Sequence, residues 1–339
     1  RLITLRFAGL ISDRFGRKTS ALIGVLCYAV YFVGIVFSPN MYVAYAFAIM
    51  GGAANSFLDT GVIPACLEIL VESSGLATIF TKLAVSLGQL LLPTMIGFVA
   101  ANELSFKSIF FLMAALIIID GILIAFMPVP PMNSNVKSGE NAASQKMKFT
   151  PAAIALIAIG FTCTSTFQLW LNCNQEFGKL VGMADPSRIQ SYYSTGTIIA
   201  VLLTAFLMKK KVQPLKFLVL YPAIAMTMLI IVYIVRTPFI CLLGGFVIGF
   251  SAAGGVLQMA TAAANDMFPA NKGKITSIIM IASSLANYII LNIAGILTKN
   301  GGAEGPLHVI LLNIGITFIG ILLAVFVNSQ YRKGKVKAS

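Results

Sequence analysis

The chain has 339 residues, of which 58% are hydrophobic and 10% are charged, and its mean hydropathy is +0.91. Soluble domains carry about 25% charged residues, so this composition excludes a soluble globular protein and indicates an integral membrane protein embedded in a lipid bilayer. The cations behind the formal net charge of +13 lie in short loops between apolar segments, which indicates membrane topology and anionic headgroups rather than nucleic-acid binding.

The first predicted elements are an apolar helix that ends near Leu10 and a second helix over residues 19–38, joined by a short polar turn. The glycine and charged residues that define this turn are Gly9, Asp13, Arg14, Gly16, Arg17 and Lys18. The glycines permit close packing and a tight turn. The cations place the turn on the cytoplasmic side, because cytoplasmic loops carry the excess of Lys and Arg.

The pattern G-x-x-x-D-R-x-G-R-K in this turn resembles the loop between helices two and three of the major facilitator superfamily. The resemblance implies an all-α membrane protein with the major facilitator fold, in which two pseudo-symmetric six-helix bundles enclose a cavity that opens alternately to either side. Helix 1 and part of helix 2 of that fold are expected to be missing, because the chain begins inside an apolar run. The resemblance also implies that Asp13 helps to latch the cytoplasmic face closed in the outward-open state.

Ten apolar segments after Leu10 are each long enough to span a bilayer, which takes about 20 apolar residues. These predicted spans cover residues 19–38, 41–67, 76–100, 107–127, 149–171, 189–208, 215–235, 238–264, 275–298 and 307–328. With the opening turn inside, alternation puts sixteen Lys and Arg residues in inside loops and the C-terminal tail, and five in outside loops. This asymmetry predicts a multi-pass protein of the cell membrane whose motif turn, central linker and C-terminus are cytoplasmic.

The longest polar stretch, residues 128–148, is rich in proline, serine, asparagine and charge, which is typical of a flexible linker. It predicts an N-terminal helix bundle over residues 1–127 and a C-terminal helix bundle over residues 149–339. A weak internal repeat also favours two related bundles. A shift of 198 residues places Gly51 on Gly249 and Gln89 on Asn287.

Polar groups inside a bilayer are energetically costly, so each marks a candidate site. The span over residues 41–67 carries Asn55 and Asp59, which lie four residues apart and therefore share one face of a helix. Burial disfavours the charged carboxylate, so Asp59 could take up a proton, as proton-coupled transport requires. The alternative is a structural role, in which Asp59 pairs with Arg6 or caps a helix that breaks before Pro64.

Besides Asn55, the candidates for binding a substrate are Arg1, Gln89, Trp170, Gln258 and Asn287. Arg1 lies deep in an apolar helix, where it would meet either a carboxylate or an anionic or hydroxyl-rich substrate. The three amides also lie deep in their spans and could line a cavity. Trp170 lies among Gln168, Asn172 and Asn174 at the predicted outer end of a helix. There it is either a platform for a sugar ring or part of the interfacial aromatic belt.

The span over residues 238–264 is rich in glycine. Gly245 and Gly249 form a G-x-x-x-G pair, which permits close helix packing. The adjacent glycines Gly254 and Gly255 could bend the helix.

Residue types that bind metals or carry out nucleophilic catalysis are scarce. The five cysteines lie in or beside apolar segments without disulfide or metal-ligand spacing, and there is one histidine. No nucleophile–base pair is visible. We therefore expect no metal site, no cofactor and no enzymatic activity.

The segment from Asn55 to Pro64 resembles the fourth helix of carriers related to the fucose and hexose–proton symporters. This resemblance favours a proton-coupled symporter for a small polar solute such as a sugar, with Asp59 as the proton site. A multidrug–proton antiporter, whose pocket would be mostly aromatic and apolar, and a non-transporting receptor or scaffold are the alternatives. The expected partners are a small-molecule substrate, protons and lipid but no nucleic acid, and the chain is expected to be a monomer.

Overall fold

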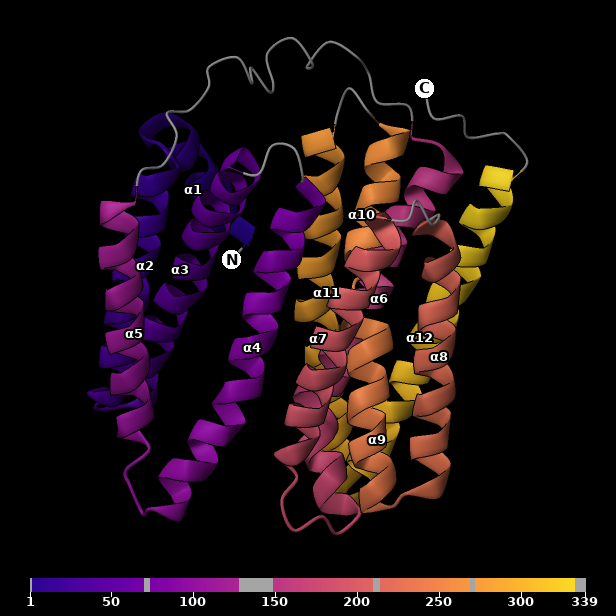
Figure 1. Ribbon diagram of the computed structural model, residues 1–339. Helices are drawn as coiled ribbons and strands as arrows, with labels where there is room; N and C mark the ends of the chain where they lie inside the picture. Colours follow the sequence, from indigo (N-terminus) through magenta and orange to yellow (C-terminus); the bar gives the residue numbers. More distant parts are fainter. Residues whose placement is uncertain (1, 70–73, 128–148, 210–213, 269–271, 333–339) are drawn as a thin grey trace. The chain divides into compact units, whose positions relative to one another are not determined.

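The computed structural model describes residues 2–69, 74–127, 149–209, 214–268 and 272–332. These residues form helices joined by short turns, and no strand occurs among them (Figure 1). The predicted all-α class is therefore confirmed. Arg1 and the predicted linker, residues 128–148, lie outside the described residues.

The helices correspond to the predicted spans. The first half contains α1 (Leu2–Phe15), α2 (Arg17–Val36), α3 (Met41–Ile69), α4 (Ser74–Ala101) and α5 (Lys107–Phe126). The second half contains α6 (Pro151–Leu180), α7 (Arg188–Lys209), α8 (Pro214–Val235), α9 (Pro238–Ile248), α10 (Val256–Met267), α11 (Lys272–Gly301) and α12 (Gly305–Arg332). Seven stretches of the described chain are long and apolar enough to cross a membrane, and the last of them includes parts of both α11 and α12.

The end of α6 is the largest difference from the predicted boundaries. The predicted span stops at residue 171, whereas α6 continues to Leu180. The polar residues past this point are accommodated within the helix: Asn172 Nδ2 donates to the Gln168 carbonyl oxygen at 2.9 Å, and Lys179 pairs with Glu176 at 3.1 Å. Hydropathy marks where a helix leaves the apolar layer, not where its backbone hydrogen bonds end. The prediction that Trp170 lies at a helix end was therefore wrong.

The internal repeat extends to the helix boundaries. Helices α2, α3, α4 and α5 begin at Arg17, Met41, Ser74 and Lys107, and positions 198 residues later are Leu215, Phe239, Lys272 and Gly305. Helices α8, α9, α11 and α12 begin at Pro214, Pro238, Lys272 and Gly305. The starts of α3 and α5, and those of α9 and α12, each follow a described residue, and for these two pairs the offset of 198 relates the helix starts to within a residue.

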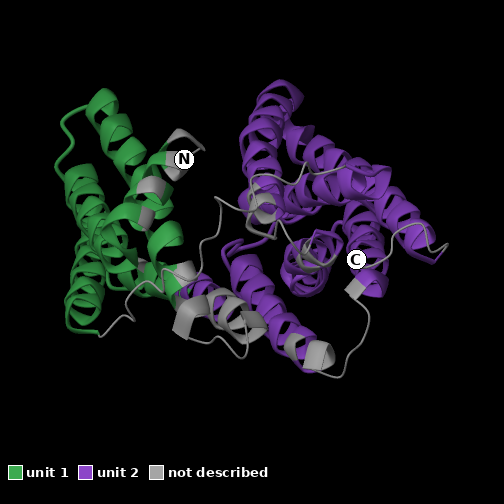
Figure 2. Cartoon of the chain, turned by 90° about the horizontal axis from the view of Figure 1, so that it is seen from above, with its two compact units in different colours: residues 1–82, 94–136 green, residues 83–93, 137–339 purple. Residues whose placement is uncertain are grey.

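The chain divides into two compact units (Figure 2). Unit 1 comprises residues 1–82 and 94–136, and unit 2 comprises residues 83–93 and 137–339. The middle of α4 thus groups with unit 2, whereas the predicted N-terminal bundle contained the whole of this helix.

In unit 1, α2 and α3 pack through small residues. A methyl group built at Gly24 of α2 would lie 2.8 Å from Leu58 Cγ, and one built at Gly61 of α3 would lie 2.8 Å from the Arg17 carbonyl oxygen. Between these contacts, the hydroxyl of Ser20 donates to the Phe57 carbonyl oxygen at 3.0 Å. Small residues let the two backbones approach closely, which is how helices associate where lipid supplies no hydrophobic drive.

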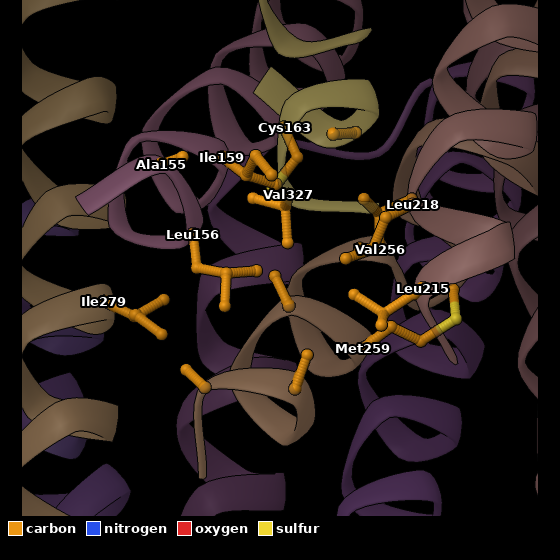
Figure 3. Packing of buried hydrophobic residues seen from close by; sticks show 14 of the residues in the cluster. Ala155, Leu156, Ile159, Cys163, Leu215, Leu218, Val256, Met259, Ile279 and Val327 are labelled. Carbon is orange, nitrogen blue, oxygen red and sulfur yellow. The ribbon is translucent and has the colours of Figure 1, made fainter. Parts of the chain in front are cut away.

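Unit 2 has a larger apolar core, part of which is shown in Figure 3. Leu156 and Ile159 of α6 point toward Leu218 of α8, Met259 of α10 and Ile279 of α11, and all five side chains are almost completely buried. A second cluster contains Trp170, Phe177 and Tyr193. Helix α6 therefore runs through the centre of the unit, which explains why most of its residues are buried.

The glycine-rich helix of unit 2 is interrupted. α9 ends at Ile248, a π-helical turn follows over Gly249–Ala253, and α10 begins after Gly255, whose φ of +127° favours glycine. Helix α7 stabilises this break with two buried hydroxyls. Thr197 shares its hydroxyl proton between the Tyr193 carbonyl oxygen at 2.9 Å and the Gly249 carbonyl oxygen at 3.1 Å, and Thr204 donates to the Gly254 carbonyl oxygen at 3.1 Å. The predicted bend is confirmed, and it is a full break supported from the neighbouring helix.

We expect the Thr204→Val substitution to destabilise unit 2 by about 1–3 kcal/mol, because it leaves the buried Gly254 carbonyl oxygen without its hydroxyl donor while keeping the side-chain shape. The measurement is the midpoint of thermal unfolding in detergent. Thr227→Val is the matched control: Thr227 is exposed on α8 and donates only within its own helix, to Ala223. Equal midpoints for the two variants would contradict a supporting role for Thr204.

Candidate functional site

The motif turn joins α1 to α2 and is held by hydrogen bonds to α3 and to the end of α5. Gly16 occupies the turn with φ +94°, a conformation that side chains other than glycine rarely adopt. Arg17 donates from Nη1 to Ser12 Oγ at 2.9 Å, and Ser12 donates in turn to the Thr60 carbonyl oxygen at 2.8 Å. Lys18 donates to the Met127 carbonyl oxygen at 3.3 Å. The predicted tight turn is confirmed.

The other motif residues have different surroundings. Arg14 is exposed, and its guanidinium lies 5.6 Å from the centre of the Phe15 ring. No atom of the described part of the chain lies within 4 Å of a methyl group built at Gly9. The Asp13 side chain lies outside the described structure.

Asn55 and Asp59 lie on one face of α3, as predicted from their spacing. Ala54 and Leu58 face α2, since both lie within 3.1 Å of a methyl group built at Gly24. Asn55 and Asp59 follow these two residues and are therefore rotated by about 100° away from α2. Both side chains are partly buried. The backbone of α3 stays helical through Pro64, so the alternative in which Asp59 caps a helix that breaks before Pro64 is wrong.

The three amide candidates lie on different helices. Gln89 is in the part of α4 that groups with unit 2, Gln258 is in α10 and Asn287 is in α11, and all three are partly buried. Asn287 differs in one respect: its Oδ1 atom is buried without a hydrogen-bond partner among the described residues. An unpaired buried carbonyl oxygen is costly and indicates a group that acquires its partner elsewhere.

Trp170 lies in the interior of unit 2, with 2% of its surface exposed. Its ring packs against Gly244 of α9, where a methyl group would lie 3.2 Å from Cη2. Its Nε1 atom and the Oδ1 atom of Asn174, one helical turn away, are both buried without a partner in the described chain. The ring therefore presents no open face to a sugar in this structure, and it does not face lipid as a belt residue would.

Sequence reasoning missed a polar seam that joins α6 to its neighbours in unit 2. Thr164 donates to Ser283 of α11 at 2.8 Å. Thr166 shares a 2.8 Å hydrogen bond with Thr317 of α12, and Asn313 donates to the Thr166 carbonyl oxygen at 3.1 Å. The run Thr162–Thr166, which places four hydroxyl residues and one cysteine within an apolar helix, was the available signal, since hydroxyls commonly bond across membrane helices.

The family model for the Major Facilitator Superfamily matches residues 2–287 of the chain. YfkL of Bacillus subtilis (strain 168), an uncharacterized MFS-type transporter, is 34% identical over 343 residues, which cover 98% of this chain and 85% of YfkL.

Two solved transporters share the fold. The D-xylose–proton symporter superposes with a TM-score of 0.72 at 18% identity, covering 96% of this chain and 83% of the symporter. FucP, the fucose–proton symporter of E. coli, superposes in its outward conformation with a TM-score of 0.67 at 13% identity, covering 96% of this chain and 86% of FucP. At these identities the similarity concerns the fold alone.

Proposed function

The chain belongs to the major facilitator superfamily of membrane transporters, and we propose that it carries a small polar solute, such as a sugar, by proton-coupled symport with alternating access. The membrane is proposed to be the cell membrane, and the excess of Lys and Arg on one side of the predicted spans sets the orientation of the chain. On this basis the motif turn, the central linker and the C-terminus are cytoplasmic.

The observation that carries the proposal is the position of Asp59. It is a partly buried acid well inside the helix α3, and it lies on a face turned away from the α2 contact. A charged carboxyl group in an apolar span is energetically costly. Uptake of a proton neutralises the group and lowers the free-energy cost of moving it from a hydrated to an apolar environment. Asn55, one turn earlier on the same face, is proposed to bind the solute beside this proton site.

The amides favour a polar solute over an apolar drug. Gln89, Gln258 and Asn287 are partly buried side chains in otherwise apolar helices, and amides donate and accept hydrogen bonds to hydroxyl groups. The two solved structures described above are of sugar–proton symporters, which supports a sugar as the first candidate. Arg1 is proposed as a further contact for the same solute.

The motif turn is proposed to act in gating. Arg17 and Ser12 connect α1 to the Thr60 carbonyl of α3, and Lys18 reaches the end of α5. A movement of α3 would therefore be transmitted to the turn through short hydrogen bonds. Asp13 is proposed to latch the cytoplasmic face, with Gly9, Arg14 and Gly16 shaping the turn.

Proteoliposomes test the proposal. The purified protein is reconstituted with a pH-sensitive dye inside, and L-fucose, D-xylose, D-glucose or a cationic dye is added outside. We expect one of the sugars, and not the cationic dye, to drive proton uptake. Proton movement that follows addition of the cationic dye, and of no sugar, would support a multidrug antiporter. If no added compound drives proton movement, a receptor or scaffold would be favoured.

A further inference from the structure

Helices α6 and α11 of unit 2 run alongside each other in a constant register. A methyl group built at Gly160 of α6 would lie 2.8 Å from Ile279 Cγ2 of α11. One turn further along, Thr164 Oγ1 donates to Ser283 Oγ at 2.8 Å. In each pair, the two residues are 119 positions apart in the sequence. Because four residues make about one turn in each helix, the next pair in this register is Gln168 and Asn287.

The polar atoms at this position are unevenly satisfied. Asn287 Oδ1 is buried and has no hydrogen-bond partner in the described chain. Gln168 Oε1 accepts a hydrogen bond from Asn172 Nδ2 at 3.0 Å, and the Gln168 main-chain carbonyl accepts one from the same nitrogen at 2.9 Å. Asn172 therefore holds the carbonyl end of the Gln168 amide, which leaves the Gln168 NH2 group as its donor end.

We propose that Gln168 and Asn287 bind one hydroxyl group of the transported solute. Asn287 Oδ1 accepts the hydroxyl proton, and Gln168 Nε2 donates to the hydroxyl oxygen. A hydroxyl is a neutral group that both donates and accepts through one oxygen atom, whereas a carboxylate or an ether would leave Asn287 Oδ1 unpaired. Asn172 is a positioning residue, because it acts on the solute only through Gln168.

This proposal rests on the proposed function and narrows it. It requires a solute with at least one hydroxyl group. It also assigns Gln168 and Asn172 to the binding of that hydroxyl and gives Asn287 a defined role as its acceptor. Leaving a buried polar group unpaired is the main source of discrimination against analogues that lack the matching group, so the effect should be visible in solute selectivity.

The test compares how sugars and their deoxy analogues bind to the wild type and to variants of the proposed site. Binding of L-fucose, D-xylose, D-glucose and their monodeoxy analogues to purified protein is measured by calorimetry, for the wild type, Asn287→Leu and Gln168→Glu. We expect one deoxy position to weaken binding to the wild type by about tenfold. Both variants should bind the parent sugar as weakly as that analogue, with no further loss for the analogue itself.

Two controls separate a binding role from a structural one. Asn292→Leu, at an exposed asparagine of the same helix, should leave binding unchanged. Asn172→Ala should weaken sugar binding less than Gln168→Glu does, since the hydroxyl contact itself remains. Thermal midpoints without sugar identify any variant that fails to fold, and Asn287→Ala, a smaller side chain that also lacks the oxygen acceptor, then replaces Asn287→Leu.

The outcomes distinguish this proposal from the proposed function. Sugar-driven proton uptake together with full selectivity between sugar and deoxy analogue in Asn287→Leu would overturn the hydroxyl site and leave the symporter intact. Binding of the cationic dye with no sugar binding at all would overturn both. Loss of the selectivity in the two variants, with the Asn292→Leu control unaffected, would support the site.

Discussion

The Asp59→Asn variant is expected to lose solute-driven proton uptake, down to the level of liposomes without protein. The amide has nearly the same size and shape as the carboxyl group, but it does not take up a proton at physiological pH. Because the partly buried side chain keeps its volume, packing around α3 should be preserved. The measurement is dye-reported proton uptake in proteoliposomes upon addition of the sugar that the wild type transports.

The same variant should still exchange the solute. Counterflow of labelled sugar between equal concentrations on both sides needs no net proton movement, so we expect exchange within about threefold of the wild type. Glu103→Gln is the matched control, because Glu103 is an exposed acid in the turn between α4 and α5 and should leave coupling unchanged. An Asp59→Asn protein that still moves protons with sugar would remove Asp59 from the coupling mechanism.

The second large effect is expected at Gly249, where the Gly249→Ala substitution should destabilise unit 2 by about 1–3 kcal/mol. The Cβ position of residue 249 collides with the carbonyl group of Tyr193 in α7. Backbone atoms cannot rotate aside, so α7 and the interrupted helix would have to separate. Separation would also lengthen the hydrogen bond from Thr197 to the Gly249 carbonyl oxygen. The measurement is thermal unfolding in detergent.

Gly295→Ala gives a control of opposite sign. Gly295 lies within α11, is exposed, and has no atom of the described residues within 4 Å of a built methyl group. Alanine should therefore stabilise the helix by up to about 1 kcal/mol, through its better helix propensity. Equal shifts for both variants would show that the close contact between α7 and the π-helical turn does not limit stability.

Some properties of this protein were predictable because they are local. The spans follow from runs of about 20 apolar residues, and the helices found in the structure match them in order and position. The turn at Gly16 follows from glycine and charge between two apolar runs. The shared face of Asn55 and Asp59 depends only on the helical period, which needs no information about neighbouring helices.

Other features depend on which distant residues meet. The continuation of α6 to Leu180 and the burial of Trp170 arise because α6 crosses the centre of unit 2. Composition alone predicted that the helix stops at residue 171 and that Trp170 lies at its end. The register between α6 and α11, from which the pairing of Gln168 with Asn287 is inferred, comes from contacts between residues 119 positions apart.

The sequence by itself therefore determined the helical spans, their repeat at 198 residues and the family, because hydropathy and motif spacing are properties of the chain alone. Only the tertiary structure decided which polar groups find partners. Thr164 and Thr197 are satisfied by α11 and by the π-helical turn, whereas Asn287 Oδ1 has no partner among the residues that the structure describes. In an apolar interior each hydrogen bond requires two groups brought together by packing, and packing is a property of the folded chain.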